Sequence, residues 1–273
     1  MIKSTFRNIS NRIPGASALF RNVRDQLDRN LPTIKTKWGF TLAGNYEMGM
    51  GEFEPEETEV VRHLILDVDV VVNIGANIGY YCCHALSLGK PVIAVEPISR
   101  NLHYLLRNVR ENGWEKKVEI FPLALGSCTN IQSIWGGGTG ASLIKGWASV
   151  PENYVTQIPI MTLDRILGGV LEGKKSLIIA DVEGGEYMLL KGATNTLKNN
   201  VRPIWLVEIA TKEHQPVKDQ INPNYESTFS IFFENGYRAF AVKKNYPEIS
   251  KSDVLSTAQG IKIPPAHNYL FRQ

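Results

Sequence analysis

The stretch that most constrains this chain covers residues 70–81 and has the sequence VVVNIGANIGYY. It begins as an apolar, β-branched run, which is typical of a buried parallel strand. The run breaks at a turn that contains Gly75 and Gly79, and we expect an apolar helix over residues 80–88. Glycine adopts backbone conformations that are closed to other residues, and free N–H groups at a helix start favour a carboxylate or phosphate. The stretch therefore predicts a ligand-binding turn between a strand and a helix.

A second apolar strand begins at residue 91 and ends in Glu96. In nucleotide-binding units, an acid about twenty residues after the glycine turn accepts hydrogen bonds from ribose hydroxyls. Dinucleotide sites use G-x-G-x-x-G, whose middle glycine lets the backbone touch the pyrophosphate. This chain has Asn77 at that position. The pattern favours a riboside without a pyrophosphate, of which S-adenosylmethionine is the commonest.

The remaining apolar segments predict an α/β fold with a doubly wound, mostly parallel sheet. Five parallel strands are expected to begin at residues 70, 91, 117, 176 and 203. Residues 237–242 and 268–272 are expected to pair as a closing antiparallel hairpin, which brings the sheet to seven strands. A helix is expected over residues 99–112, because apolar residues recur there at helical spacing.

Acidic side chains follow the fourth strand, which ends at Asp181, and Glu183 comes two residues later. Ligands of open α/β sheets bind outside the carboxyl ends of the strands. Carboxylates there suit acid–base chemistry or the binding of a cation such as Mg²⁺, although Asp181 could instead cap the next helix. The fifth strand ends in Glu208, and His214 follows in a polar loop as a further candidate base or a solvated residue. Ser142, in a glycine-rich connection, is a candidate substrate contact.

Composition excludes several classes of function. The formal net charge of +3 on 273 residues gives no sign of a nucleic-acid or membrane partner. Three cysteines without paired spacing argue against a disulfide framework, and no zinc-ligand spacing occurs. We expect no required metal. No apolar stretch is long enough to span a bilayer and no signal peptide is expected, so a cytoplasmic location is predicted.

Several motifs recur in a fixed order along the chain. They are NIGANIGYY at 73–81, VEP at 95–97 with Asn101, ADVEGGE at 180–186, LVEI at 206–209 and NYLF at 268–271. In order and spacing they resemble the motifs of the FkbM family of S-adenosylmethionine-dependent methyltransferases, which act mostly on hydroxyl groups. The resemblance covers roughly residues 51–273. The chain departs from the family pattern at Asn73, where Asp is usual, and at Ile179, where Lys is frequent.

The resemblance implies a Rossmann-like class I methyltransferase fold with S-adenosylmethionine as cofactor. We expect the glycine turn to hold the methionine portion, Glu96 to hold the ribose, and Asn101 to support the loop after Glu96. Ala124, after the third strand, is expected near the adenine. The expected cofactor-binding residues are Asn73, Gly75, Ala76, Asn77, Gly79, Glu96, Pro97, Asn101 and Ala124. The expected catalytic residues are Asp181, Glu183 and His214.

The implied function is methyl transfer to a hydroxyl group of a sugar, glycan or natural product. Residues 55–273 are expected to form the methyltransferase domain, and residues 1–54 a helical or hairpin extension. An amphipathic helix over residues 18–31 would serve packing or a homo-oligomer, or would act as a lid or a contact to an anionic surface. Two rival functions remain open at this point. One is an NAD-dependent oxidoreductase, and the other is a non-catalytic adaptor that keeps the fold, for which Asn73 and Ile179 would be suited.

Overall fold

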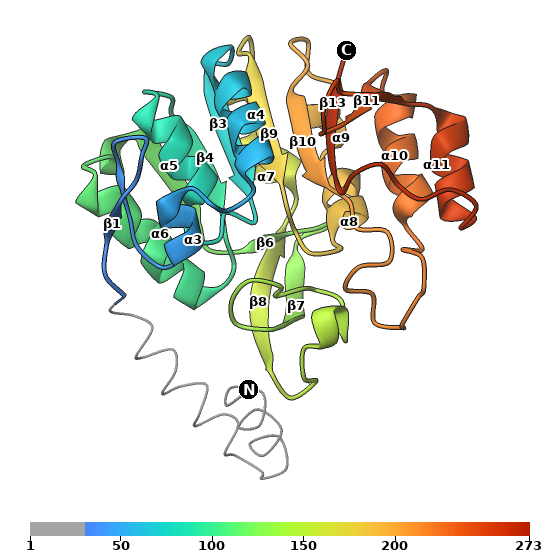
Figure 1. Ribbon diagram of the computed structural model, residues 1–273, viewed down its shortest axis with the longest axis horizontal. Coiled ribbons are helices and arrows are strands. Elements are labelled where there is room, and N and C mark those ends of the chain that lie inside the picture. Colours follow the sequence, from blue (N-terminus) through green and yellow to red (C-terminus); the bar gives the residue numbers. More distant parts are fainter. Residues whose placement is uncertain (1–30) are drawn as a thin grey trace.

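The computed structural model describes residues 31–273 (Figure 1). All but the last residue of the helix expected over residues 18–31 lies outside this range. Of the helices described, none combines the length and the apolar character that a bilayer crossing requires. The helices are α3 (Tyr46–Met50), α4 (Pro55–Leu66), α5 (Tyr80–Ser87), α6 (Ser99–Glu111), α7 (Leu163–Leu167), α8 (Glu186–Lys191), α9 (Thr194–Leu197), α10 (Tyr225–Glu234) and α11 (Lys251–Ala258).

The central sheet has the strand order β12-β11-β13-β10-β9-β3-β4-β5. The five strands from β10 to β5 are parallel, and the three at the other end are antiparallel to their neighbours. Their bounds are β3 (Val70–Ile74), β4 (Val92–Val95), β5 (Val118–Phe121), β9 (Ser176–Ala180), β10 (Ile204–Glu208), β11 (Arg238–Ala241), β12 (Glu248–Ile249) and β13 (Asn268–Arg272). The prediction of a doubly wound, mostly parallel sheet is confirmed.

The predicted number of seven strands is wrong by one, because the sheet has eight strands among residues 31–273. The additional strand is β12, which is only two residues long and pairs with β11. Two residues are too few to produce an alternating pattern in the sequence. Glu248 of β12 accepts two hydrogen bonds from the Arg238 guanidinium at 2.8 and 2.6 Å, and this contact holds the short strand at the sheet edge.

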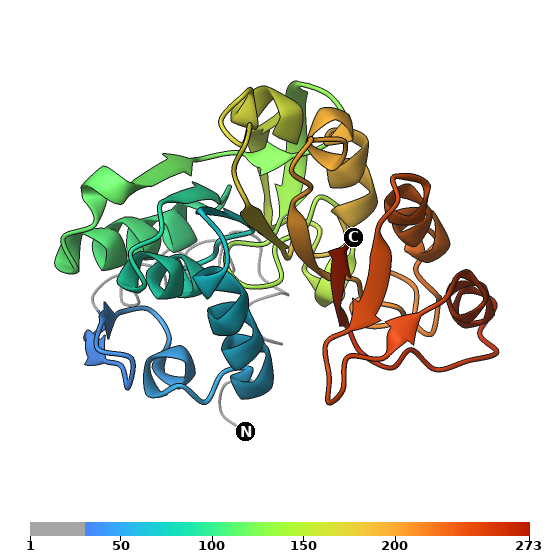
Figure 2. The ribbon, with the colours of Figure 1, turned by 90° about the horizontal axis from the view of Figure 1, so that it is seen from above.

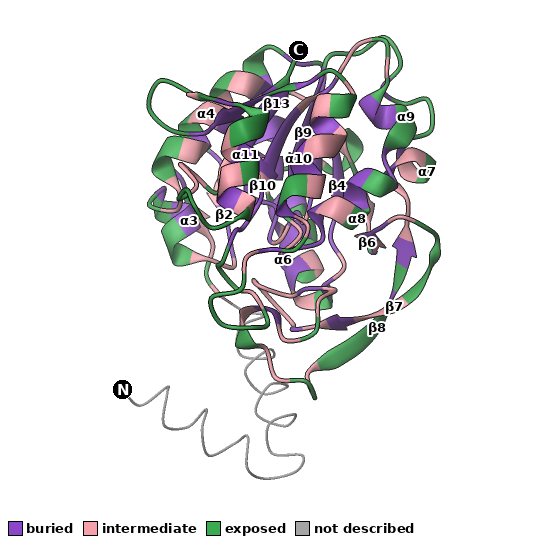
Figure 3. Ribbon diagram, turned by 90° about the vertical axis from the view of Figure 1, so that its right-hand side faces the viewer, coloured by how far each residue is buried: buried purple, intermediate pink, exposed green. Residues whose placement is uncertain are grey.

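Both faces of the sheet are covered by helices, as Figure 2 shows. Successive residues of a strand point to opposite faces, so a strand covered on both sides must be apolar throughout. In β3, Val70, Val72 and Ile74 join the core formed with α7, α8, α9 and α10. Val71 joins the core formed with α4, α5 and α6. This explains why residues 70–74 form a continuous apolar run interrupted only by Asn73. In Figure 3 the central strands are accordingly buried while the outer helix faces are exposed.

A second, three-stranded sheet extends away from the central one at the lower end of Figure 1. It consists of β6 (Ala124–Leu125), β7 (Asn130–Trp135) and β8 (Val155–Met161), in the order β6-β8-β7. The glycine-rich connection of residues 136–141 and the segment that follows it join β7 to β8. This sheet places residues 138–147 beside the carboxyl ends of the central strands.

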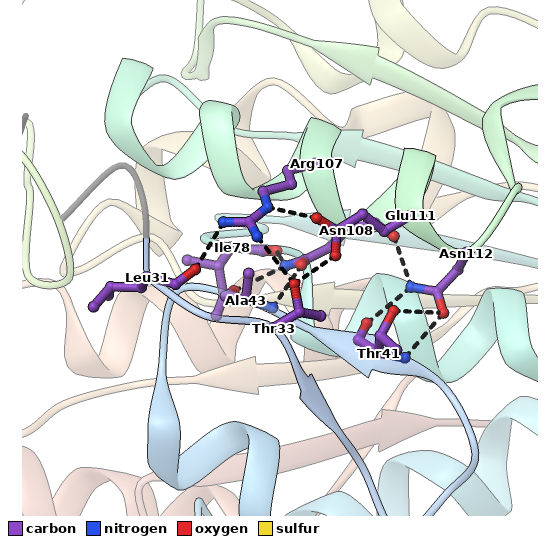
Figure 4. Close-up of polar contacts among 9 residues, drawn as sticks. All are labelled: Leu31, Thr33, Thr41, Ala43, Ile78, Arg107, Asn108, Glu111 and Asn112. Atoms are coloured by element: carbon purple, nitrogen blue, oxygen red, sulfur yellow. Dashed lines mark hydrogen bonds and ion pairs between the residues drawn. The ribbon is translucent and has the colours of Figure 1, made fainter.

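Residues 31–54 form a hairpin of β1 (Ile34–Lys35) and β2 (Thr41–Leu42), followed by α3, and they pack against α6 (Figure 4). The Asn112 side chain bonds both backbone groups of Thr41, and the Asn108 side chain bonds both backbone groups of Ala43. Asn108 Nδ2 also donates to the carbonyl of Ile78, at 2.9 Å. The helix thus ties this hairpin to the start of α5. The boundary after residue 54 stays a prediction.

Replacing Asn108 by Ala tests this attachment. Asn108 is fully buried, and its loss leaves the N–H of Ala43 and two carbonyls without their partner. We expect the free energy of unfolding to fall by about 1–3 kcal/mol, measured by urea denaturation. Arg110→Ala, on the exposed face of the same helix, is the control and should change it by less than about 0.5 kcal/mol. Equal effects of the two substitutions would contradict the role of Asn108.

Candidate active site

A cavity lies at the carboxyl ends of β3, β4 and β9, and its space, together with the open solvent at its mouth, is about 660 Å³. Six of the expected cofactor-binding residues line it, namely Gly75, Asn77, Glu96, Pro97, Asn101 and Ala124. Two of the expected catalytic residues, Asp181 and Glu183, line it as well. The cavity therefore brings both groups of residues to one place.

Glu96 is the buried acid at the end of β4, and its carboxylate is held by three donors. The Asn77 N–H donates to Oε2 at 2.7 Å, and the Ile98 N–H donates to Oε1 at 2.8 Å. Asn101 Nδ2 donates to Oε1 at 3.2 Å. Burial raises the pKa of Glu96 to about 7, although the hydrogen bonds oppose this shift. Each carboxylate oxygen can accept two hydrogen bonds, so Oε2 retains capacity for a ligand hydroxyl.

Asn101 has an acceptor that no residue of the described chain satisfies. Its side chain is buried and lines the cavity, and Oδ1 has no hydrogen-bond partner among residues 31–273. The orientation of the amide is set by Glu96, because a carboxylate oxygen accepts from Nδ2 and leaves Oδ1 on the other side. Buried polar groups are nearly always hydrogen-bonded, so Oδ1 is suited to accept a bond from a bound molecule.

Packing within the chain, and not the approach of a ligand, explains why the turn has glycine at positions 75 and 79. Gly75 has φ = 74°, and a Cβ there would lie 1.7 Å from the carbonyl oxygen of Asp181. Gly79 has φ = 86°, and a Cβ there would lie 2.4 Å from Leu105 Cδ1 on α6. Neither position accepts a side chain. Asn77, between them, directs its Nδ2 to Thr139 Oγ1 at 3.3 Å and so connects the turn to the glycine-rich connection.

Three expected cofactor-binding residues do not line the cavity. Asn73 is buried in β3 and accepts a hydrogen bond from Cys82 Sγ of α5 at 3.3 Å. Ala76 belongs to the core under α4, α5 and α6, and Gly79 faces α6. The structure gives each of them a packing role at the helix side of the turn. Their contact with a cofactor stays a prediction.

Three carboxyl groups gather where β9 and β10 end. Asp181 is exposed along the cavity wall, yet the surrounding protein atoms withdraw it from bulk water. This desolvation and the negative charges of Glu208 and Glu183 raise the pKa of Asp181 well above its usual range. Desolvation, followed by the charge of Glu183, raises the pKa of Glu208 to about 8. At neutral pH Glu208 therefore retains a proton that an isolated carboxyl group would lose.

Glu183 has a partner that the sequence did not indicate. Trp147 Nε1 donates to Glu183 Oε2 at 2.7 Å, and the Ser142 hydroxyl donates to the Glu183 carbonyl at 2.6 Å. Ser142, a candidate substrate contact, thus holds the turn after β9. His214 does not line the cavity; its carbonyl accepts from the Ala148 N–H at 2.8 Å, and its ring centroid lies 6.0 Å from that of Trp147. Its role as a base stays a prediction.

The described residues show no cluster of side chains suited to bind a metal ion. Among residues 31–273, no three His, Cys, Asp or Glu side chains lie together in a way that could hold a metal ion. Glu186, the next acid after Glu183, is buried and accepts the Gly184 N–H on Oε1 at 3.0 Å. It therefore closes the turn before α8.

With this fold and this cavity, the chain has the architecture of a class I methyltransferase. The sequence model of the methyltransferase FkbM domain matches residues 73–239, which is more than half of the chain. The chain therefore belongs to the FkbM methyltransferase family. Comparison with curated proteins found no match.

Solved structures of methyltransferases resemble the chain at low identity. The methyltransferase FkbM from Methylobacillus flagellatus KT is 18% identical, with a TM-score of 0.43 over 76% of this chain and 44% of that protein. The chain thus spans less than half of that relative. The precorrin-6y C5,15-methyltransferase from Geobacter metallireducens is 10% identical, with a TM-score of 0.41 over 80% and 88%. Fibrillarin from Aeropyrum pernix, solved with S-adenosylmethionine bound, is 14% identical, with a TM-score of 0.37 over 74% and 65%.

The buried carboxyl group of Glu186 predicts a pH dependence of stability. Burial raises its pKa from 4.5 to about 8, so the folded chain binds this proton more tightly than the unfolded chain. Its stabilising contribution is full below pH 4.5 and is lost as the pH rises toward 8. We expect Glu186→Gln, which keeps a neutral acceptor, to lose less stability than the wild type over this range. Urea denaturation at several pH values measures it, and parallel curves for both proteins would contradict the expectation.

Proposed function

We propose that this protein is an S-adenosylmethionine-dependent O-methyltransferase that methylates a hydroxyl group of a sugar, glycan or natural product. The observation that carries the proposal is the single cavity lined by Glu96 at one side and by Asp181 and Glu183 at the other. A ribose acceptor and a proton acceptor are both needed for this reaction, and one cavity contains candidates for each. The acceptor class itself rests on the family resemblance.

The side chains of the cavity suggest how the cofactor would be held. Glu96 Oε2 and Asn101 Oδ1 have capacity to accept hydrogen bonds from the ribose hydroxyls. The apolar part of the wall, formed by Ile98, Leu123 and Ile134, suits an adenine ring. In the turn after β3, the N–H groups of Gly75 and Ala76 already bond the Val95 carbonyl and that of Asn77 bonds Glu96, so the contact of this turn with the methionine portion remains a prediction. The residues in these assignments line the same cavity as Ala124 and Asp181.

Methyl transfer to a hydroxyl requires little covalent chemistry from the protein itself. When bound, the cofactor supplies the methyl carbon that the acceptor oxygen attacks. The chain must align the acceptor with that carbon and exclude water, which can lower the barrier by about 7–11 kcal/mol. A carboxylate of Asp181 or Glu183 accepts the hydroxyl proton, and such general-base help contributes about 10²–10⁴-fold in rate.

The rival functions are less well supported. Membership in a methyltransferase family argues against an NAD-dependent oxidoreductase. The non-catalytic adaptor was suggested by Asn73 and Ile179, but both side chains are buried on the sheet face that α4, α5 and α6 cover, and neither lines the cavity. Both departures thus lie away from the cavity walls. The cytoplasmic location, a homo-oligomer and the absence of a nucleic-acid partner remain predictions.

Label transfer tests the proposed function. The purified protein is incubated with methyl-labelled S-adenosylmethionine and a panel of glycans, sugars and macrolide alcohols. We expect label in a methyl ether of at least one acceptor and release of S-adenosylhomocysteine in equal amount. Binding of the cofactor without transfer to any acceptor would favour the adaptor instead.

Replacing Glu96 by Ala tests the cofactor site without an acceptor. Hydrogen bonds to a charged group contribute about 1.5–3 kcal/mol, and we expect calorimetry to show a loss of this size in S-adenosylhomocysteine binding. Glu119→Ala, which removes an exposed carboxylate from the neighbouring strand β5, is the matched control and should leave the affinity unchanged. Unchanged affinity in Glu96→Ala would remove Glu96 from the ribose role.

A further inference from the structure

Trp147 is the buried residue through which the second sheet reaches the acids of the cavity. Its side chain is 1% exposed, and it does not line the cavity itself. Its Nε1 donates to Glu183 Oε2 at 2.7 Å. An indole N–H can only donate, so Oε2 must be the acceptor. Trp147 therefore fixes the direction of the Glu183 side chain.

The backbone of Glu183 is restrained from the same side. It has φ = 53°, a left-handed conformation that is uncommon for residues other than glycine. The Ser142 hydroxyl donates to its carbonyl and accepts from the Ile144 N–H at 3.0 Å. A strained conformation of this kind persists only where its surroundings over-determine it. Residues 142–147 supply those surroundings.

The packing against Gly184 explains how closely this segment fits. A Cβ at Gly184 would lie 2.5 Å from Trp147 Cζ3 and 2.8 Å from Ile144 Cδ1. Only a glycine lets the indole ring approach the turn after β9 this closely. The ring and the turn thus form one unit, in which rotation of the Glu183 side chain away from the cavity would break the bond to Trp147.

The other acid at this edge has different neighbours. Asp181 faces the negative charges of Glu208 and Glu183, and no Lys, Arg or His of the described chain forms an ion pair with it. Glu183, in contrast, accepts a hydrogen bond from the Trp147 indole. The environments of the two acids therefore differ, and paired acids with different environments divide the roles of acid–base chemistry.

We propose that Trp147 is a positioning residue that holds the Glu183 carboxylate at the cavity wall as the general base for the acceptor hydroxyl. This role rests on the proposed function. In the step, the acceptor oxygen forms a bond to the methyl carbon, and the carbon–sulfur bond breaks with its electron pair going to sulfur. The hydroxyl proton passes to Glu183. The products are a methyl ether, S-adenosylhomocysteine and a protonated Glu183.

Nuclear magnetic resonance of the indole N–H groups tests the contact without any acceptor. The chain has five Trp residues, and the Trp147→Phe variant identifies the Trp147 resonance by its loss. We expect this proton to resonate downfield in the wild type and to move upfield in Glu183→Gln and further in Glu183→Ala. Glu119→Gln, on the exposed face of β5, should leave it in place. A Trp147 resonance that does not respond to either Glu183 variant would overturn the proposal.

Kinetics with the acceptor found by label transfer test the role in catalysis. Misplacement of a reacting group by about 1 Å can cost about 10²-fold, so we expect Trp147→Phe to lower kcat by up to this factor while the KM for S-adenosylmethionine stays the same. The control is Trp205→Phe, which alters another fully buried Trp, in the core of the sheet, and should retain the wild-type kcat. Equal kcat in Trp147→Phe and the wild type would overturn the positioning role.

The two experiments separate this inference from the function on which it rests. If the wild type transfers no methyl group to any acceptor, the proposed function fails and the catalytic role of Trp147 fails with it. If the wild type is active but the indole resonance ignores Glu183, only the role of Trp147 is overturned.

Discussion

The close approach of Gly75 to the carbonyl oxygen of Asp181 is the constraint on which the rest of this site depends. The two residues follow neighbouring parallel strands, β3 and β9, and the Asp181 N–H donates to the Ile74 carbonyl at 3.0 Å. Any side chain at Gly75 would overlap the Asp181 backbone. The glycine turn and the acid edge can therefore form one cavity. A β-carbon at Gly75 would have to push the two strand ends apart, and the cofactor side and the acid side of the cavity would separate with them.

The connection between β7 and β8 of the second sheet forms part of the cavity wall. The connection between β7 and β8 brings Thr139 to Asn77 and Trp147 to Glu183, so it contacts the cavity at both sides. In each case a side chain of the connection bonds a residue in a turn that follows a central strand. The turns have backbone conformations with positive φ at Asn77 and Glu183, and these contacts help to hold them. The cavity is thus built jointly by strand ends of the central sheet and by one connection of the smaller sheet.

Much of the fold follows from local patterns. The central strands and the helix over residues 99–112 were predictable because continuous apolar runs and helical spacing are local signals, as were the strand-end positions of Gly75, Glu96 and Asp181. Trp147 was not predictable, because its partner lies 36 positions away in the sequence and the contact depends on the second sheet. The packing of Asn73 against α5 and of Gly79 against α6 was not predictable, because the turn pattern does not show which residues face a helix and which face a cavity. Strand β12 was missed because two residues carry no periodicity.

A crystal structure of the chain with S-adenosylhomocysteine bound would test most directly whether the cofactor lies in this cavity. We expect the ribose hydroxyls to bond Glu96 and Asn101, with the sulfur atom facing the space between Asp181 and Glu183. A ligand bound outside the cavity would contradict this, as would a sulfur atom turned away from both acids.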